Sequence, residues 1–100
     1  MRFRLRFAPS ATADLALLAY DRGLQDTRTA VLRALAKMET NLRHPGLKTH
    51  KYKGKRCPHG NDLFEAYAQN KTAGAPYRIF FCYVPGEKDM LLIVDIVPHP

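Results

Sequence analysis

Acidic residues are scarce in this sequence, cysteine occurs only twice, and no apolar run is long enough to cross a bilayer. The missing run argues against a membrane-spanning helix, and Met1–Arg6 has no apolar segment of the kind that a signal peptide needs. We therefore expect a cytoplasmic protein without a membrane partner. In that compartment Cys57 and Cys82 are expected to be free thiols, and a bridge between them is the less favoured alternative.

The charge that is present is mostly positive and unevenly distributed. Residues 1–56 hold 13 of the 16 Lys and Arg residues and 4 of the 9 Asp and Glu residues, a net charge of +9, whereas residues 57–100 carry −2. One-sided positive charge favours a polyanionic partner, nucleic acid first and an acidic protein second. The plainer alternative is a solvated basic surface. With 100 residues, 46% of them hydrophobic, the chain is expected to form one ordered domain, residues 1–100.

The N-terminal part of the chain predicts one strand followed by a helical hairpin. Residues 2–7 alternate strictly, with phenylalanine and leucine on one face and three arginines on the other. Such an arginine face needs an anion or acidic side chains over it, or it is the charged edge of a sheet. Apolar residues at helical spacing then predict helices over residues 11–22 and 28–42, with Ser10 as the N-cap of the first and Gly23 in the link.

The C-terminal part predicts three strands in a meander. They cover residues 63–68, 76–84 and 90–97, with polar turns at Asn70–Ala75 and Pro85–Asp89. The middle strand is apolar on both faces, which is typical of a strand inside a sheet. The order β-α-α-β-β-β predicts an α+β domain in which the helical hairpin covers one face of a mostly antiparallel four-stranded sheet.

Two features stand out as candidates for a site. Residues 47–62 are the least regular and most basic segment, which we expect to be a loop with at most a short extended piece at its start. Arg78 is the one charged residue of the central strand, and a buried guanidinium needs an anion. That anion is either a carboxylate of this protein, Glu65 or Asp95, or an external phosphate. The candidate phosphate-binding residues of the basic segment are Lys48, Lys51, Lys53, Lys55 and Arg56.

These residue types suit the cleavage of RNA without a metal. Such a reaction needs a base for the 2′-hydroxyl, cations for the phosphate and an acid for the leaving oxygen. His50 and His99 are candidates for the proton transfers, although His50 could serve only to bind and His99 could lie in a disordered terminus. A zinc site built on Cys57 and His59 is the weaker alternative, because the cysteine and histidine spacing matches no standard finger. We therefore expect no metal and no cofactor.

The order and spacing of these segments resemble the RelE/ParE superfamily of bacterial type II toxin–antitoxin systems, over essentially the whole chain. The most telling pieces are Leu47–Gly54, Leu63–Tyr67 and Tyr77–Phe81. The resemblance implies a toxin held inactive by a cognate antitoxin that wraps it. Members of the RelE branch cut messenger RNA, usually on the ribosome, and so inhibit translation, whereas members of the ParE branch poison DNA gyrase without known nuclease chemistry.

The resemblance also implies roles for individual residues. Arg78 matches a strand arginine that contacts the scissile phosphate, and His99 lies where some members keep a catalytic histidine. Phe64 stands where many members have tryptophan, and the last strand offers Asp95 where many carry an arginine. We favour a RelE-like mRNA endoribonuclease. The alternatives are a ParE-like gyrase inhibitor and a degenerate member that only binds nucleic acid or antitoxin, and a homodimer stays open.

Overall fold

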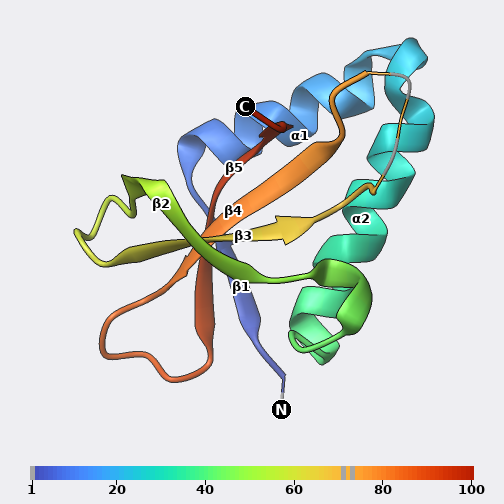
Figure 1. Ribbon diagram of the computed structural model, residues 1–100. Coiled ribbons are helices and arrows are strands. Elements are labelled where there is room, and N and C mark those ends of the chain that lie inside the picture. The colour runs from blue at the N-terminus through green and yellow to red at the C-terminus, as the bar shows by residue number, and fades with distance from the viewer. Residues whose placement is uncertain (1, 71, 73) are drawn as a thin grey trace.

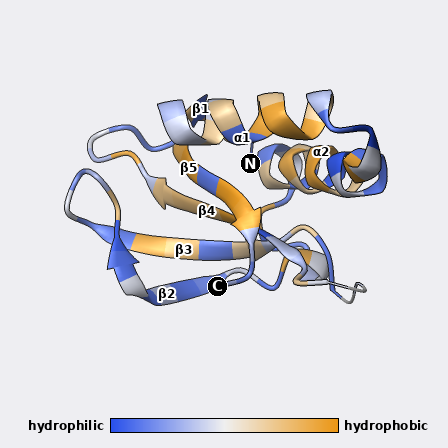
Figure 2. Cartoon of the chain, turned by 90° about the horizontal axis from the view of Figure 1, so that it is seen from above, coloured by the Kyte–Doolittle hydropathy of each residue, from blue (hydrophilic) through white to orange (hydrophobic). Residues whose placement is uncertain are grey.

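The computed structural model describes residues 2–70, 72 and 74–100, which form two helices and five strands in a single sheet (Figure 1). The elements are β1 (Arg4–Phe7), α1 (Pro9–Tyr20), the 3₁₀ turn η1 (Arg22–Leu24), α2 (Gln25–Thr40), the 3₁₀ turn η2 (Pro45–Leu47), β2 (His50–Arg56), β3 (Asp62–Tyr67), β4 (Tyr77–Tyr83) and β5 (Met90–Pro98). Both helices lie on one side of the sheet (Figure 2). No helix in the described ranges is both long enough and apolar enough to cross a membrane.

The sheet has five strands in the order β1-β5-β4-β3-β2, and it is mixed because β1 runs parallel to β5. The predicted four-stranded sheet was therefore one strand short. Residues 50–56, predicted as a loop, form the edge strand β2, which pairs antiparallel with β3. Nearly every residue of β2 is exposed, and the strand is conspicuously hydrophilic (Figure 2). Backbone pairing rather than an apolar face holds it, so its sequence carried no strand signal.

Helix α1 is held on β5 by two polar contacts. Ser10, predicted as an N-cap, instead donates its hydroxyl to the carbonyl of Val94 over 2.6 Å. The carboxylate of Asp14 accepts the backbone N–H of Ile96 over 2.8 Å, and burial raises the pKa of this carboxyl. The helix starts at Pro9, where the missing N–H is no loss because the first turn of a helix leaves its N–H groups unpaired. Both ends of α1 therefore lie two residues before those of the predicted helix, residues 11–22.

The main core lies between the helices and the sheet. Of the apolar stripe predicted for α2, Val31, Leu35 and Met38 are buried, whereas Leu42 is partly buried and lies outside the helix, which covers residues 25–40 rather than 28–42. The buried stripe meets β4 and β5 side chains such as Phe81 and Ile93. A second apolar cluster lies on the opposite face of the sheet, hereafter the open face. Its buried members are Cys57, Leu63, Phe80, Cys82, Val84, Met90, Leu92 and Val94.

Cys57 and Cys82 form a disulfide across this second cluster, with their Cα atoms 6.1 Å apart. The prediction of free thiols was therefore wrong. The chain after β2 turns back over the open face and buries Cys57 against the central strand, which its polar sequence neighbours did not indicate. His59 lies beside the bridge, with Nδ1 3.6 Å from the Cys57 sulfur. The three potential metal-ligand atoms thus come together, but both sulfurs are already bonded to each other.

The arginine face of β1 is covered by the protein's own carboxylates. Arg4 contacts Asp89 at 2.9 Å and Glu87 at 3.6 Å, and Arg6 contacts Glu87 at 3.5 Å. Both acids lie beyond β4, in the turn that leads to β5. The hydrogen bond from Arg4 lowers the pKa of Asp89. Acidic side chains therefore relieve the repulsion between these arginines. The predicted turn at Asn70–Ala75 lies partly outside the described residues.

Candidate functional site

A buried carboxylate on the open face joins three basic side chains that come from separate parts of the chain. Glu65 of β3 is 2% exposed, and strand alternation turns it away from the helices while its neighbour Phe64 packs under them. His50 begins β2 and pairs directly with Glu65, Arg78 lies on β4, and His99 follows β5. We call these four residues the Glu65 cluster.

Arg78 is buried, and its contacts are with the protein itself. Nε lies 3.8 Å from a carboxylate oxygen of Glu65, a distance that makes the contact ionic rather than a hydrogen bond. Nη1 donates to the backbone carbonyls of Gln69 (2.5 Å) and Tyr77 (3.2 Å). The guanidinium also lies over the ring of Tyr67, 3.5 Å from its centroid. The sequence left three candidate anions for Arg78, namely Glu65, Asp95 and an external phosphate. In the structure, the carboxylate beside Arg78 is that of Glu65.

His50 is fixed at both ring nitrogens. Nε2 lies 2.7 Å from Oε1 of Glu65, and Nδ1 lies 2.8 Å from the carbonyl oxygen of Lys48. The carbonyl oxygen can only accept, so Nδ1 donates to it, and Nε2 faces the carboxylate of Glu65. Lys48 has φ +46°, the one positive φ among the described non-glycine residues, and this turn leads the chain into β2.

His99 is the least constrained member of the cluster. Its backbone N–H donates to the carbonyl of Pro76 over 2.8 Å, which holds the segment after β5 against the sheet. Nδ1 lies 3.3 Å from Oε2 of Glu65, and about half of the side chain is exposed. In the tautomer that carries its proton on Nδ1, which faces the carboxylate, Nε2 has a lone pair that can take a proton. The contact between His99 and Glu65 is an ion pair rather than a hydrogen bond, because Oε2 of Glu65 accepts no hydrogen bond from the described residues.

The predicted phosphate-binding residues form a basic edge along β2. The Lys48 ammonium lies 5.4 Å from the centroid of the Tyr67 ring, on which the guanidinium of Arg78 also lies. The others are exposed, and three of them have acidic neighbours. Lys51 contacts Asp62 at 3.2 Å, Lys55 contacts Asp95 at 3.4 Å, and Arg56 lies 3.9 Å from Asp62, while Lys53 is also exposed.

Sequence reasoning missed Glu65 as the centre of the site, because it weighed this residue only as an ion-pair partner for Arg78. A signal was present. Glu65 is the one acidic residue within an otherwise apolar stretch of β3, flanked by Phe64 and Ala66. A carboxylate that alternates with core residues must lie on the opposite face of the strand, where β4 places Arg78.

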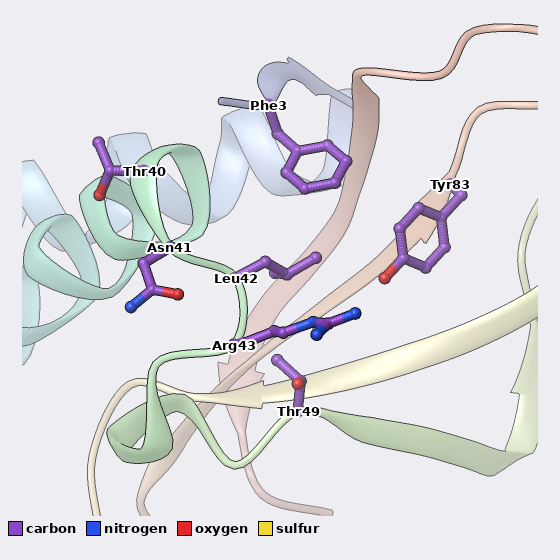
Figure 3. A pocket seen from close by; sticks show the side chains of 7 residues that line it. All are labelled: Phe3, Thr40, Asn41, Leu42, Arg43, Thr49 and Tyr83. Atoms are coloured by element: carbon purple, nitrogen blue, oxygen red, sulfur yellow. The ribbon is translucent and has the colours of Figure 1, made fainter. Parts of the chain in front are cut away.

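A cavity of about 510 Å³ lies away from the Glu65 cluster, and its lining contains no acid–base pair. Figure 3 shows its lining residues Phe3, Thr40, Asn41, Leu42, Arg43, Thr49 and Tyr83. Burial raises the pKa of Tyr83, and Arg43 partly offsets this. The cavity therefore offers a phenol and a guanidinium but no group suited to proton transfer near neutral pH. Its size alone does not make it the candidate active site.

A helical hairpin on one face of a five-stranded mixed sheet, with the titratable cluster on the other face, defines the class of small α+β fold to which the chain belongs. The structure of the YoeB dimer from Staphylococcus aureus has this fold, with a TM-score of 0.65, 13% sequence identity and coverage of 100% of both chains. No protein-family model and no curated protein sequence matches the chain. At this identity the likeness shows the fold.

Proposed function

We propose that this protein is the toxin of a type II toxin–antitoxin system and that it cleaves messenger RNA without a metal. The YoeB fold supports the class of toxin, because YoeB is a toxin of the RelE superfamily, which the sequence also resembles. The observation that carries the nuclease assignment is the Glu65 cluster, in which one buried carboxylate holds two half-exposed histidines beside a basic edge.

The geometry suggests a division of labour between the two histidines. His99, oriented through Nδ1 by Glu65, takes the proton of the 2′-hydroxyl at Nε2 as that oxygen attacks phosphorus. His50 acts as the general acid and gives a proton to the leaving 5′-oxygen, exchanging its contact with Glu65 for the substrate. Lys48 and the basic edge hold the phosphate. Arg78 lies 3.8 Å from Glu65 and adds positive charge beneath the site.

A ParE-like gyrase inhibitor is the second candidate, and one observation favours it. The guanidinium of Arg78 is engaged by a carboxylate and two carbonyls of the protein, so it does not present itself to an external phosphate. A degenerate member that binds nucleic acid or antitoxin without cutting would share this feature. Under either alternative, the Glu65 cluster is a structural network and the basic edge is a docking surface.

The partners and setting that we propose follow from the toxin assignment. A cognate antitoxin would cover the basic edge, whose charge suits an acidic segment. The substrate would be message on the ribosome in the cytoplasm. The YoeB structure is of a dimer, which makes a homodimer part of the proposal.

Induced expression in a bacterial host tests the proposal, with protein synthesis and DNA synthesis followed by pulse labelling. We expect translation to stop quickly and message to be cut. His99→Ala removes a half-exposed side chain, so it should abolish both effects at unchanged thermal stability. The control is His44→Asn, because asparagine can still accept the Gly46 N–H that His44 accepts at 3.0 Å. Continued translation with a DNA-damage response would instead favour gyrase.

A further inference from the structure

A second, smaller cavity of about 240 Å³ lies on the open face, and none of the four residues of the Glu65 cluster lines it. The residues that line it come from β2, β3, β4 and β5 and from the segment after β5. Its lining residues are Tyr52, Gly54, Lys55, Leu63, Phe80, Asp95, Val97 and Pro100. Its volume is below the range of about 300–1,000 Å³ that is usual for drug-sized ligands, which suits a single planar group.

Two of the residues that line this cavity are aromatic, and one is a glycine. The rings of Tyr52 and Phe80 meet edge to face, with centroids 5.0 Å apart. A Cβ atom on Gly54 would come within 2.9 Å of the Tyr52 ring, so the absence of a side chain there lets the ring lie across the strand. Phe80 is 5% exposed, so Tyr52 is the ring that can meet a nucleobase, and aromatic rings stack bases of any sequence.

A β-bulge turns one polar group toward the cavity. Phe80 pairs with Asp95 of β5, whereas the next residue, Phe81, pairs with Ile93, so Val94 is an extra residue in that strand. Ile93 and Ile96 both pack under the helices, and the inserted residue places Val94 and Asp95 together on the open face. Strict alternation would have directed Asp95 into the core with Ile93.

Two residues that line the cavity pair directly with residues of the Glu65 cluster. Glu65 pairs directly with Phe80, and Arg78 pairs directly with Val97. Side chains directly opposite one another on an antiparallel pair have Cβ atoms only about 4.5–5.5 Å apart. A nucleotide whose phosphate lies at the Glu65 cluster therefore has the cavity within reach of its own base or of an adjacent one.

We propose that this cavity reads a guanine base next to the scissile phosphate, with Asp95 as the specificity-determining residue. A carboxylate repels phosphate, so the group that enters is the uncharged base. Guanine alone presents two adjacent N–H donors, at N1 and N2, which one carboxylate can accept together, and single-stranded RNA exposes this edge. Lys55, 3.4 Å from Asp95, can donate to the neighbouring O6. The proposal rests on the ribonuclease function proposed above.

Binding of single nucleotides tests the pocket without any cleavage. The full chain carrying His99→Ala is titrated with the four nucleoside 3′-monophosphates, and chemical shifts are followed by NMR. We expect guanosine monophosphate to bind about tenfold more tightly than the others, the discrimination of a good bidentate pair. Asp95→Asn, which offers one acceptor and one donor, should lose this preference and favour adenosine monophosphate.

The matched control is Asp62→Asn, which makes the same charge change at a carboxylate that also faces a lysine of β2. It should change all four affinities equally and leave their ratios unaltered. Equal binding of the four nucleotides, or a guanine preference that survives Asp95→Asn, would overturn the proposal.

Mapping of cleaved ends in cells separates this proposal from the nuclease assignment. Asp95→Asn should still cut message but lose the enrichment of guanine beside the cut. Cutting with an identical sequence profile in both proteins would refute the pocket and leave the ribonuclease standing. Guanine binding that depends on Asp95, in a protein that cuts no RNA, would keep the pocket and refute the nuclease.

Discussion

Replacing Glu65 by glutamine should strongly destabilise the fold, because it leaves Arg78 buried without a counterion. The two side chains are 3% and 5% exposed, and their charged atoms are 3.8 Å apart. At that distance, with an effective dielectric constant of about 20, the Coulomb attraction is roughly 4 kcal/mol. Removing one partner of a buried pair typically costs about 3–5 kcal/mol. Such a loss is a large part of the roughly 5–15 kcal/mol that stabilises a domain.

Urea denaturation followed by circular dichroism measures the loss directly. Asp62→Asn is the control on the same strand, since its carboxylate is about half exposed and its pairing with Lys51 should contribute less than about 1 kcal/mol. The double variant Glu65→Gln, Arg78→Gln removes both charges and should recover part of the stability. If Glu65→Gln falls within 1 kcal/mol of the parent, as the control should, then the buried pair does not act as argued.

Two further predictions concern the attachment of outlying elements. Asp14→Ala should lower the free energy of unfolding by about 1–3 kcal/mol, because it leaves the Ile96 N–H without an acceptor. Asp14→Asn keeps an acceptor for this N–H. Since folding raises the pKa of Asp14, its stabilising contribution is present at low pH and is lost as pH rises through the folded pKa. Melting curves should therefore favour Asp14→Asn over the parent increasingly from pH 3 to 7, and a constant difference would contradict this. The Cys57–Cys82 bridge joins residues 25 positions apart, and reducing it should lower the free energy of unfolding by about 3 kcal/mol. A melting temperature that does not change with reductant would show that the bridge does not stabilise the fold.

The helical hairpin and the central strands were predictable from periodicity. Val31, Leu35 and Met38 recur at helical spacing and are buried where that spacing places them. The run around Phe81 is apolar on both faces, and β4 indeed lies inside the sheet with a neighbour on each side. Local apolar patterns determine these elements, so the sequence sufficed.

The edge strand β2 and the central role of Glu65 could not be predicted from local sequence patterns. Strand β2 is charged along its length, and it forms because β3 offers a free row of backbone groups, a long-range effect. The meeting of His50, His99 and Glu65 likewise depends on the register of three pairings. The sequence indicated the two histidines and Arg78 as candidates, but only the fold shows that one carboxylate connects them.

The parallel pairing of β1 with β5 has a consequence for synthesis of the chain. The partner of Arg4 is Met90, so the first strand to be made waits for the last one. At about 5–20 residues per second, this delay is roughly 4–17 seconds. During that time α1 also lacks the β5 partners of Ser10 and Asp14, and His99 has not yet reached Glu65. A nascent chain therefore carries no assembled cluster until the residues of β5 and His99 have been synthesised, so the candidate site is absent while residues 1–98 are being made.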